Sequence, residues 1–194
     1  MARRPLMAEL PDPRATADAA TLDEMRRIAQ VRTHADGRAE LADVYVAMFN
    51  NAAVARLVGA LGEHLRFDGT LPDDVRELAI LRYASRRRLA YEWAHHVRPA
   101  TLAGIDEATV AALAADAVPV GLDPTHAAAV EAVDQIVDGS EIAAHTQRLL
   151  TREFGDAGVV ELVALCGLYA LMGYMTTAFA IEPEPDLPQR PGRS

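Results

Sequence analysis

Residues 71–104 read LPDDVRELAILRYASRRRLAYEWAHHVRPATLAG, and this stretch decides the fold. Leu78, Ile80 and Leu81 place a helix in the core, but one unbroken helix would exceed the usual length in globular proteins. We therefore expect an interruption around residues 86–90. A second helix should follow over residues 91–103 and end at Gly104, since glycine is the usual residue just past a helix C-terminus.

The composition of the whole chain favours helices. It has 194 residues, 51% of them hydrophobic and only 5% aromatic. Few β-branched or aromatic runs alternate with a period of two, which is the pattern of a half-buried strand. The sequence therefore predicts an all-α, single-domain helical bundle of about seven to eight helices over residues 21–182.

Before the central stretch, the sequence predicts an irregular N-terminal arm over residues 1–20, because prolines interrupt it. Thr21 begins a short helix as part of a capping box with Glu24. Two further helices should meet near Asn50-Asn51. Thr70 is the expected N-cap of the central helix.

After the central stretch, a short helix is expected from Ile105, and Asp123 should cap a helix that begins at Pro124. A helix over residues 140–154 should stop at Gly155. Residues 159–181 are nearly continuously apolar, but interrupting polar residues and the lack of a basic flank favour a buried core or interface helix over a membrane span. Residues 183–194 form a proline-rich flexible tail.

Charge and cysteine content restrict the possible partners. The net charge is −9, which argues against binding nucleic acid, because that binding needs clustered cations. The single cysteine, Cys166, excludes an intrachain disulfide framework and suits a reducing cytoplasm. Its apolar neighbours indicate an inert buried thiol. The N-terminus lacks the apolar core of a secretory signal, so we predict a cytoplasmic protein that binds neither membrane nor nucleic acid.

Glu92, His95 and His96 form the candidate proton-transfer group. Glu92 lies three and four residues before the histidines, so on a helix it can meet an imidazole, fix its tautomer and raise its basicity. An ordinary surface pair is the alternative. Glu77 lies in an apolar segment, where it is either a proton donor or acceptor or part of a structural salt bridge, for instance to Arg82. Adjacent helical histidines point about 100° apart, so we predict no metal site.

The stretch also resembles the carboxymuconolactone decarboxylase and alkylhydroperoxidase-D-like superfamily. That family's pattern is a Glu, a Cys-x-x-Cys that begins twelve residues later, and a His four residues after the second Cys. Glu77 matches the Glu and His96 matches the His, whereas Leu89 and Glu92 stand at the two cysteine positions. The resemblance covers about residues 38–182. Since a dithiol peroxidase needs both thiols, the chain resembles the branch without the redox pair, and peroxidase activity is disfavoured.

The resemblance implies a cofactor-free decarboxylase of a small carboxylated lactone or carbonyl acid. Its catalytic acid-base groups would be Glu77, Glu92 and His96, and the expected substrate-binding residues are Arg82, Arg88, Tyr91 and His95. The resemblance also implies a homo-oligomer, commonly a trimer or hexamer. Two alternatives remain: a non-catalytic oligomeric scaffold or small-ligand binding protein, and another proton-transfer enzyme. Convergence of the acid-base groups on a reachable cavity would favour catalysis, whereas a plugged site would favour the scaffold.

Overall fold

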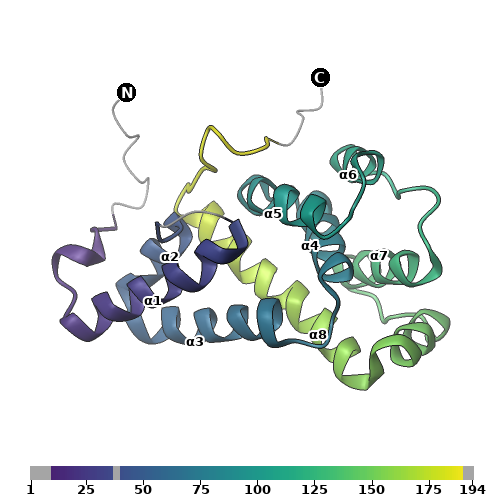
Figure 1. Ribbon diagram of the computed structural model, residues 1–194, viewed down its shortest axis with the longest axis horizontal. Helices are drawn as coiled ribbons and strands as arrows, with labels where there is room; N and C mark the ends of the chain where they lie inside the picture. Colours follow the sequence, from purple (N-terminus) through teal and green to yellow (C-terminus); the bar gives the residue numbers. More distant parts are fainter. Residues whose placement is uncertain (1–9, 37–39, 190–194) are drawn as a thin grey trace.

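The computed structural model describes residues 10–36 and 40–189, and within these ranges every regular element is a helix (Figure 1). The prediction of an all-α fold with seven to eight helices is confirmed. The α-helices are α1 (Ala19–Asp36), α2 (Asp43–Met48), α3 (Ala52–Glu63), α4 (Asp73–Arg87), α5 (Ala90–Leu102), α6 (Glu107–Ala114), α7 (Pro124–Val137) and α8 (Ala144–Ala178). Short turns of 3-10 helix lie at Pro13–Ala15 and Phe49–Asn51, and a π-helical turn at His64–Asp68.

Helix α4 is the centre of the molecule. Every residue from Val75 to Ser85 is buried, because α4 packs against α5, α7 and α8. Its side chains enter two apolar clusters. One includes Val75 and Ile80 with residues of α2, α3 and α8, and the other includes Leu78 and Leu81 with residues of α5, α6 and α7. In Figure 1, α1–α3 lie at one end, α5–α7 at the other, and α8 runs diagonally between them.

The expected break between α4 and α5 occurs at Arg88. Its backbone has φ 57° and ψ 41°, the left-handed conformation that ends a helix. The amide N–H groups of Arg88 and Leu89 donate to carbonyls in the last turn of α4, so the chain turns without leaving these groups unsatisfied. Helix α5 then ends before Gly104, which has φ 98°. Both ends of the predicted helix pair are therefore confirmed to within a residue or two.

The flanking helices agree with the sequence at several caps. Asn51 accepts a hydrogen bond from the backbone of Val54 at the start of α3. Asp123 accepts from the backbone at the start of α7, with Pro124 in the first position. Gly155 has φ 67° and ψ 178°, so α8 is two helical segments joined at a kink, as its glycine predicts.

Two predicted caps are wrong, and one helix is longer than expected. Asp18, not Thr21, caps α1, because its carboxylate accepts from the backbone N–H of Thr21 at 2.8 Å. Helix α1 runs for 18 residues, from Ala19 to Asp36, rather than forming a short helix. Thr70 does not cap α4, since its backbone N–H and hydroxyl both bind Glu161 of α8.

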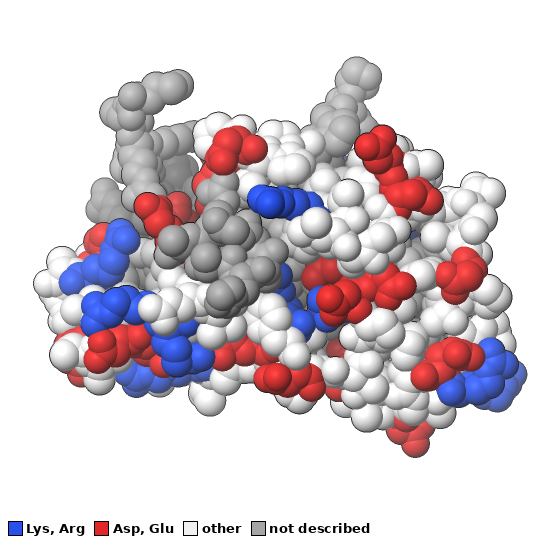
Figure 2. All heavy atoms as spheres, in the orientation of Figure 1, with Lys and Arg blue, Asp and Glu red and all other residues white. Residues whose placement is uncertain are grey.

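The long apolar segment was expected to be a buried or interface helix. Two helical segments, Asp43–Asp68 and Ala144–Ala178, are long and apolar enough to cross a membrane, although helices from soluble cores also meet this criterion. Much of α8 packs on the core, but Val160, Val163 and Tyr174 remain exposed. On the face in Figure 2, basic side chains lie in small separate groups among acidic ones.

Candidate active site

Glu77 and His96 form a buried pair between α4 and α5. The Glu77 carboxylate lies 2.7 Å from Nδ1 of His96, and the two residues are 1% and 4% exposed. The sequence predicted that a carboxylate would orient an imidazole, but on its own helix. Instead the carboxylate comes from α4, nineteen residues earlier, because the packing of α4 on α5 brings the two helices together.

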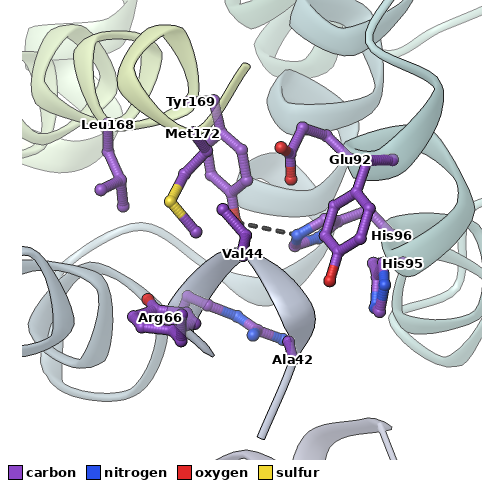
Figure 3. A pocket seen from close by; sticks show the side chains of 11 residues that line it. Ala42, Val44, Arg66, Glu92, His95, His96, Leu168, Tyr169 and Met172 are labelled. Carbon is purple, nitrogen blue, oxygen red and sulfur yellow. Dashed lines mark hydrogen bonds between the residues drawn. The ribbon is translucent and has the colours of Figure 1, made fainter. Parts of the chain in front are cut away.

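Tyr169 of α8 meets the other side of the same imidazole. Its hydroxyl lies 2.9 Å from Nε2 of His96, and the two rings are nearly perpendicular, with centroids 5.1 Å apart. Figure 3 shows the two side chains pointing toward one another. Tyr169 is one of the polar residues that interrupt the apolar segment over residues 159–181. The residues around Tyr169 in the sequence do not indicate this contact, because Tyr169 and His96 are 73 positions apart.

The hydrogen bonds fix the proton positions on a neutral His96. An ionised carboxylate only accepts, so Nδ1 donates to Glu77. Nε2 is then an acceptor, and the Tyr169 hydroxyl donates to it. Burial lowers the pKa of His96 more strongly than Glu77 raises it, which favours this neutral form.

Glu77 keeps its charge in this setting. Burial opposes ionisation, but the hydrogen bond from Nδ1–H of His96 and the charges of Arg66 and Arg76 outweigh burial, so the pKa of Glu77 is lowered. Arg76 contacts the second carboxylate oxygen at 3.4 Å and Asp73 at 2.9 Å. The salt bridge expected for Glu77 is therefore to Arg76 rather than Arg82.

His96 and Tyr169 line a small cavity among α5, α8, the start of α2 and the π-helical turn (Figure 3). The expected residues Glu92, Tyr91 and His95 line it too. The space for water-sized molecules is about 30 Å³, far below the roughly 300–1,000 Å³ of ligand pockets. The cavity is therefore large enough only for water-sized molecules, and it must widen to admit a substrate.

Arg66 is a cation of this cavity that the sequence analysis missed. It lies on the π-helical turn, is 6% exposed, and lines both this cavity and a second, larger hollow of about 540 Å³ that Glu77 also borders. A buried arginine beside a cavity can bind a carboxylate with two parallel hydrogen bonds. Arg66 lies on the turn after α3, and the fold brings this turn to the cavity beside residues of α5 and α8. The sequence alone does not distinguish Arg66 from the other arginines of the chain.

The arginines expected to bind substrate lie elsewhere. Arg82 is 3% exposed and bonds through its guanidinium to both carboxylate oxygens of Asp134, at 2.6 and 2.8 Å. This contact points it toward α7, away from the cavity. Arg88 is exposed at the break after α4. Neither residue lines the cavity of His96.

Tyr91 and His95 lie one helical turn apart, and their rings stack with centroids 4.4 Å apart. Nε2 of His95 lies 3.0 Å from Glu184, which belongs to the segment after α8. Burial raises the pKa of Tyr91 far above its ordinary value, with a contribution from nearby carboxylates, so its phenol stays neutral. The tail, expected to be flexible, is irregular as far as residue 189 but contacts the cavity wall at this point.

Cys166 has the properties expected of an inert thiol. It is 2% exposed, and burial raises its pKa to about 12, so it is protonated at neutral pH. Across residues 10–36 and 40–189, no three His, Cys, Asp or Glu side chains are grouped to hold a metal ion.

Two comparisons relate this structure to known proteins. Two crystal structures of the debrominase Bmp8, one without ligand and one of a variant bound to 2,3,4-tribromopyrrole, share the fold with a TM-score of 0.70. Each is 14% identical to the chain, and each match covers 87% of this chain and 90% of the Bmp8 chain. At this identity the likeness concerns the fold alone.

No curated protein sequence matches the chain. The sequence profile of the carboxymuconolactone decarboxylase family matches residues 52–135, a segment that includes Glu77, Glu92 and His96. The match over residues 52–135 supports the resemblance to the carboxymuconolactone decarboxylase family that the motif from Glu77 to His96 predicts.

Proposed function

We propose that the chain is an enzyme that transfers protons on a small carbonyl acid without a cofactor, and that the reaction is decarboxylation. The observation that supports this most is the buried Glu77–His96 pair, 2.7 Å apart, beside a cavity that also holds Glu92 and Arg66. A carboxylate that fixes the imidazole tautomer is the arrangement of a general acid or base. The match to the family's sequence profile over residues 52–135 is consistent with a small-molecule enzyme.

The substrate class follows from the charges around the cavity. Arg66 would hold a carboxylate of the substrate, the role that the sequence analysis gave to Arg82 or Arg88. Apolar side chains of Leu168 and Met172 form the opposite wall and would exclude water from the carboxylate that leaves as CO₂. Electrons from the breaking C–C bond need a conjugated carbonyl in the substrate, and the resulting carbon needs a proton.

The test is a screen for CO₂ release from carboxylated lactones and β-keto acids. We expect His96→Gln to lower turnover by about 10²-fold or more, the usual contribution of a general acid or base, with unchanged circular dichroism. His145→Gln is the matched control, since its side chain is 69% exposed and far from the site. Unchanged turnover in His96→Gln would contradict the assignment.

Arg66→Met tests the binding role separately. We expect KM to rise about tenfold or more, because one charge-assisted contact to a carboxylate is worth about 1.5–3 kcal/mol. Arg88→Met should leave KM unchanged. The reverse result would restore the original assignment of the substrate carboxylate to Arg88.

A non-catalytic scaffold or ligand-binding protein is the second candidate, and the small volume of the cavity favours it. The homo-oligomer implied by the family remains a prediction, consistent with exposed Val160, Val163 and Tyr174 on α8. Sedimentation analysis gives the assembly state. A stable oligomer without turnover of any acid in the screen would support the scaffold.

A further inference from the structure

The imidazole of His96 has no ring nitrogen left to meet a substrate directly. Nδ1 is bonded to Glu77 at 2.7 Å and Nε2 to the Tyr169 hydroxyl at 2.9 Å. Both contacts have ordinary hydrogen-bond distances and lie in a buried environment, where hydrogen bonds are strong. The next polar atom along this chain of contacts is the phenolic oxygen, and Tyr169 lines the cavity beside His96.

We propose that Tyr169 is the catalytic residue that exchanges the proton with the substrate, and that His96 and Glu77 act through it as positioning residues. This inference rests on the proposed function for its reaction, but the three-residue array is a property of the free protein. Its members come from α4, α5 and α8, which are held together by the packing of the core.

The two protonation states of His96 give the hydroxyl proton of Tyr169 two orientations. A neutral imidazole accepts the phenolic proton at Nε2. A protonated imidazole donates from both nitrogens, so Nε2–H bonds to the phenolic oxygen and the hydroxyl proton can turn into the cavity. Glu77 stays ionised beside Nδ1–H in both states and stabilises the imidazolium by its charge.

Decarboxylation would use the protonated state, which His96, neutral in the free protein, reaches by taking up one proton. The C–C bond to the departing CO₂ breaks, and its electron pair passes into the conjugated carbonyl as an enolate. The enolate carbon takes the proton of Tyr169, while Nε2–H of His96 gives its proton to the phenolic oxygen. A proton from water then restores the imidazolium, so one proton is consumed for each CO₂ released.

Glu92 is the competing donor, because its carboxyl lines the same cavity and is 3% exposed. Tyr169 is linked to Glu77 through the imidazole by two hydrogen bonds, and this link favours Tyr169 as the donor. The two assignments differ in which single substitution stops the reaction, and this difference decides the experiment.

The first measurement needs no substrate. In ¹⁵N NMR of histidine-labelled protein above pH 6.5, Tyr169→Phe should shift the Nε2 resonance of His96 toward the value of an unbonded imidazole nitrogen. Tyr174→Phe is the matched control, since Tyr174 lies on the same helix and is 66% exposed. A His96 resonance that is the same in Tyr169→Phe and in the unmodified protein would overturn the array.

The second measurement is turnover of acetoacetate and a carboxylated γ-lactone. Tyr169→Phe should lower kcat by about 10²-fold or more, with KM within a few-fold, because only a group acting in the proton-transfer step is lost. Tyr174→Phe should be unaffected. Replacing Tyr169 by 3-fluorotyrosine, which keeps the ring but has a more acidic phenol, should shift the pH profile of kcat, and a purely packing role would not.

The outcomes separate the two proposals. Retained kcat in Tyr169→Phe together with loss in Glu92→Gln would make Glu92 the donor and overturn the assignment of Tyr169. A His96 resonance that depends on Tyr169, in a protein that releases no CO₂ from any acid tested, would contradict the proposed decarboxylation while leaving the hydrogen-bonded array established.

Discussion

Helix α4 carries charged residues on two faces, and the two faces differ in what their charges can do. Toward α5 and α8, Glu77 meets a histidine that borders a cavity. Toward α7, Arg82 and Arg86 share the carboxylate of Asp134, and Arg86 also binds Asp138. The first group contains an imidazole, which can take up and release a proton, whereas the second contains arginine cations paired with carboxylates.

The comparison teaches that burial of a charge does not by itself mark a functional site. Arg82 is as deeply buried as His96. Its guanidinium donates hydrogen bonds to the carboxylate of Asp134 and, at 3.1 Å, to the carbonyl of Ala117. It also lies 3.6 Å from the carboxylate of Asp116. Because these partners are all protein groups, Arg82 ties α4 to α7. The site of His96 differs in that it borders space where another molecule could bind.

The largest expected effect is at Glu77, on the face of α4 toward α5 and α8, where one substitution distinguishes a role in catalysis from a role in stability. Glu77→Gln keeps the size of the side chain but removes the charge that stabilises a protonated His96. We expect kcat to fall about 10²-fold or more, with a smaller change in stability. Steady-state kinetics and urea unfolding on the same preparation measure both. A variant that is destabilised but has normal kcat would place Glu77 with the structural charges.

The second prediction concerns the face toward α7. Asp134→Ala leaves Arg82 buried without its bidentate partner, and we expect the free energy of unfolding to fall by about 3 kcal/mol. The kcat of the folded variant should be unchanged. Replacing both partners, as in Arg82→Met with Asp134→Leu, should recover much of the stability, because no unpaired buried charge remains. Loss of kcat at full stability would contradict the division between the two faces.

A third, smaller effect is the pH dependence of stability. The pKa of His96 is lowered in the folded protein, so below about pH 6.5 the unfolded chain binds more protons than the folded one. The free energy of unfolding should therefore fall as the pH is lowered from 6.5. The lowered pKa of Glu77 adds a loss that begins below about pH 4.3.

His96→Gln is the control for this pH effect. Urea unfolding between pH 7.5 and 5 should show a shallower loss of stability in this variant than in the unmodified protein. Equal slopes in the two proteins would mean that His96 has no lowered pKa.

The smallest expected effect is at Cys166. Because its thiol is buried and its pKa is raised, Cys166→Ser should leave turnover unchanged, and iodoacetamide should not label the native protein. The unmodified protein should not consume peroxide. Peroxide consumption that persists in Cys166→Ser would instead reveal a redox activity independent of thiols.

Local sequence determined the helices and most of their ends. Glycines at 104 and 155, the Asp123-Pro124 pair and the arginine run before Leu89 are short-range signals, because they act on the backbone within a few residues. Local rules failed where a distant group competed. Thr70 has the chemistry of an N-cap, but its hydroxyl donates to Glu161 of α8, and α4 begins only after Pro72. Such a competition cannot be read from neighbouring residues.

The sequence by itself determined the all-α class, the helix pair around residue 88 and the pairing of Glu77 with His96 as members of one motif. Only the tertiary structure decided what that motif contacts. It placed Tyr169 and Arg66 beside His96 and directed Arg82 toward α7. The physical reason is that backbone conformation depends on neighbours in the chain, whereas the partner of a buried polar side chain depends on which helices pack together.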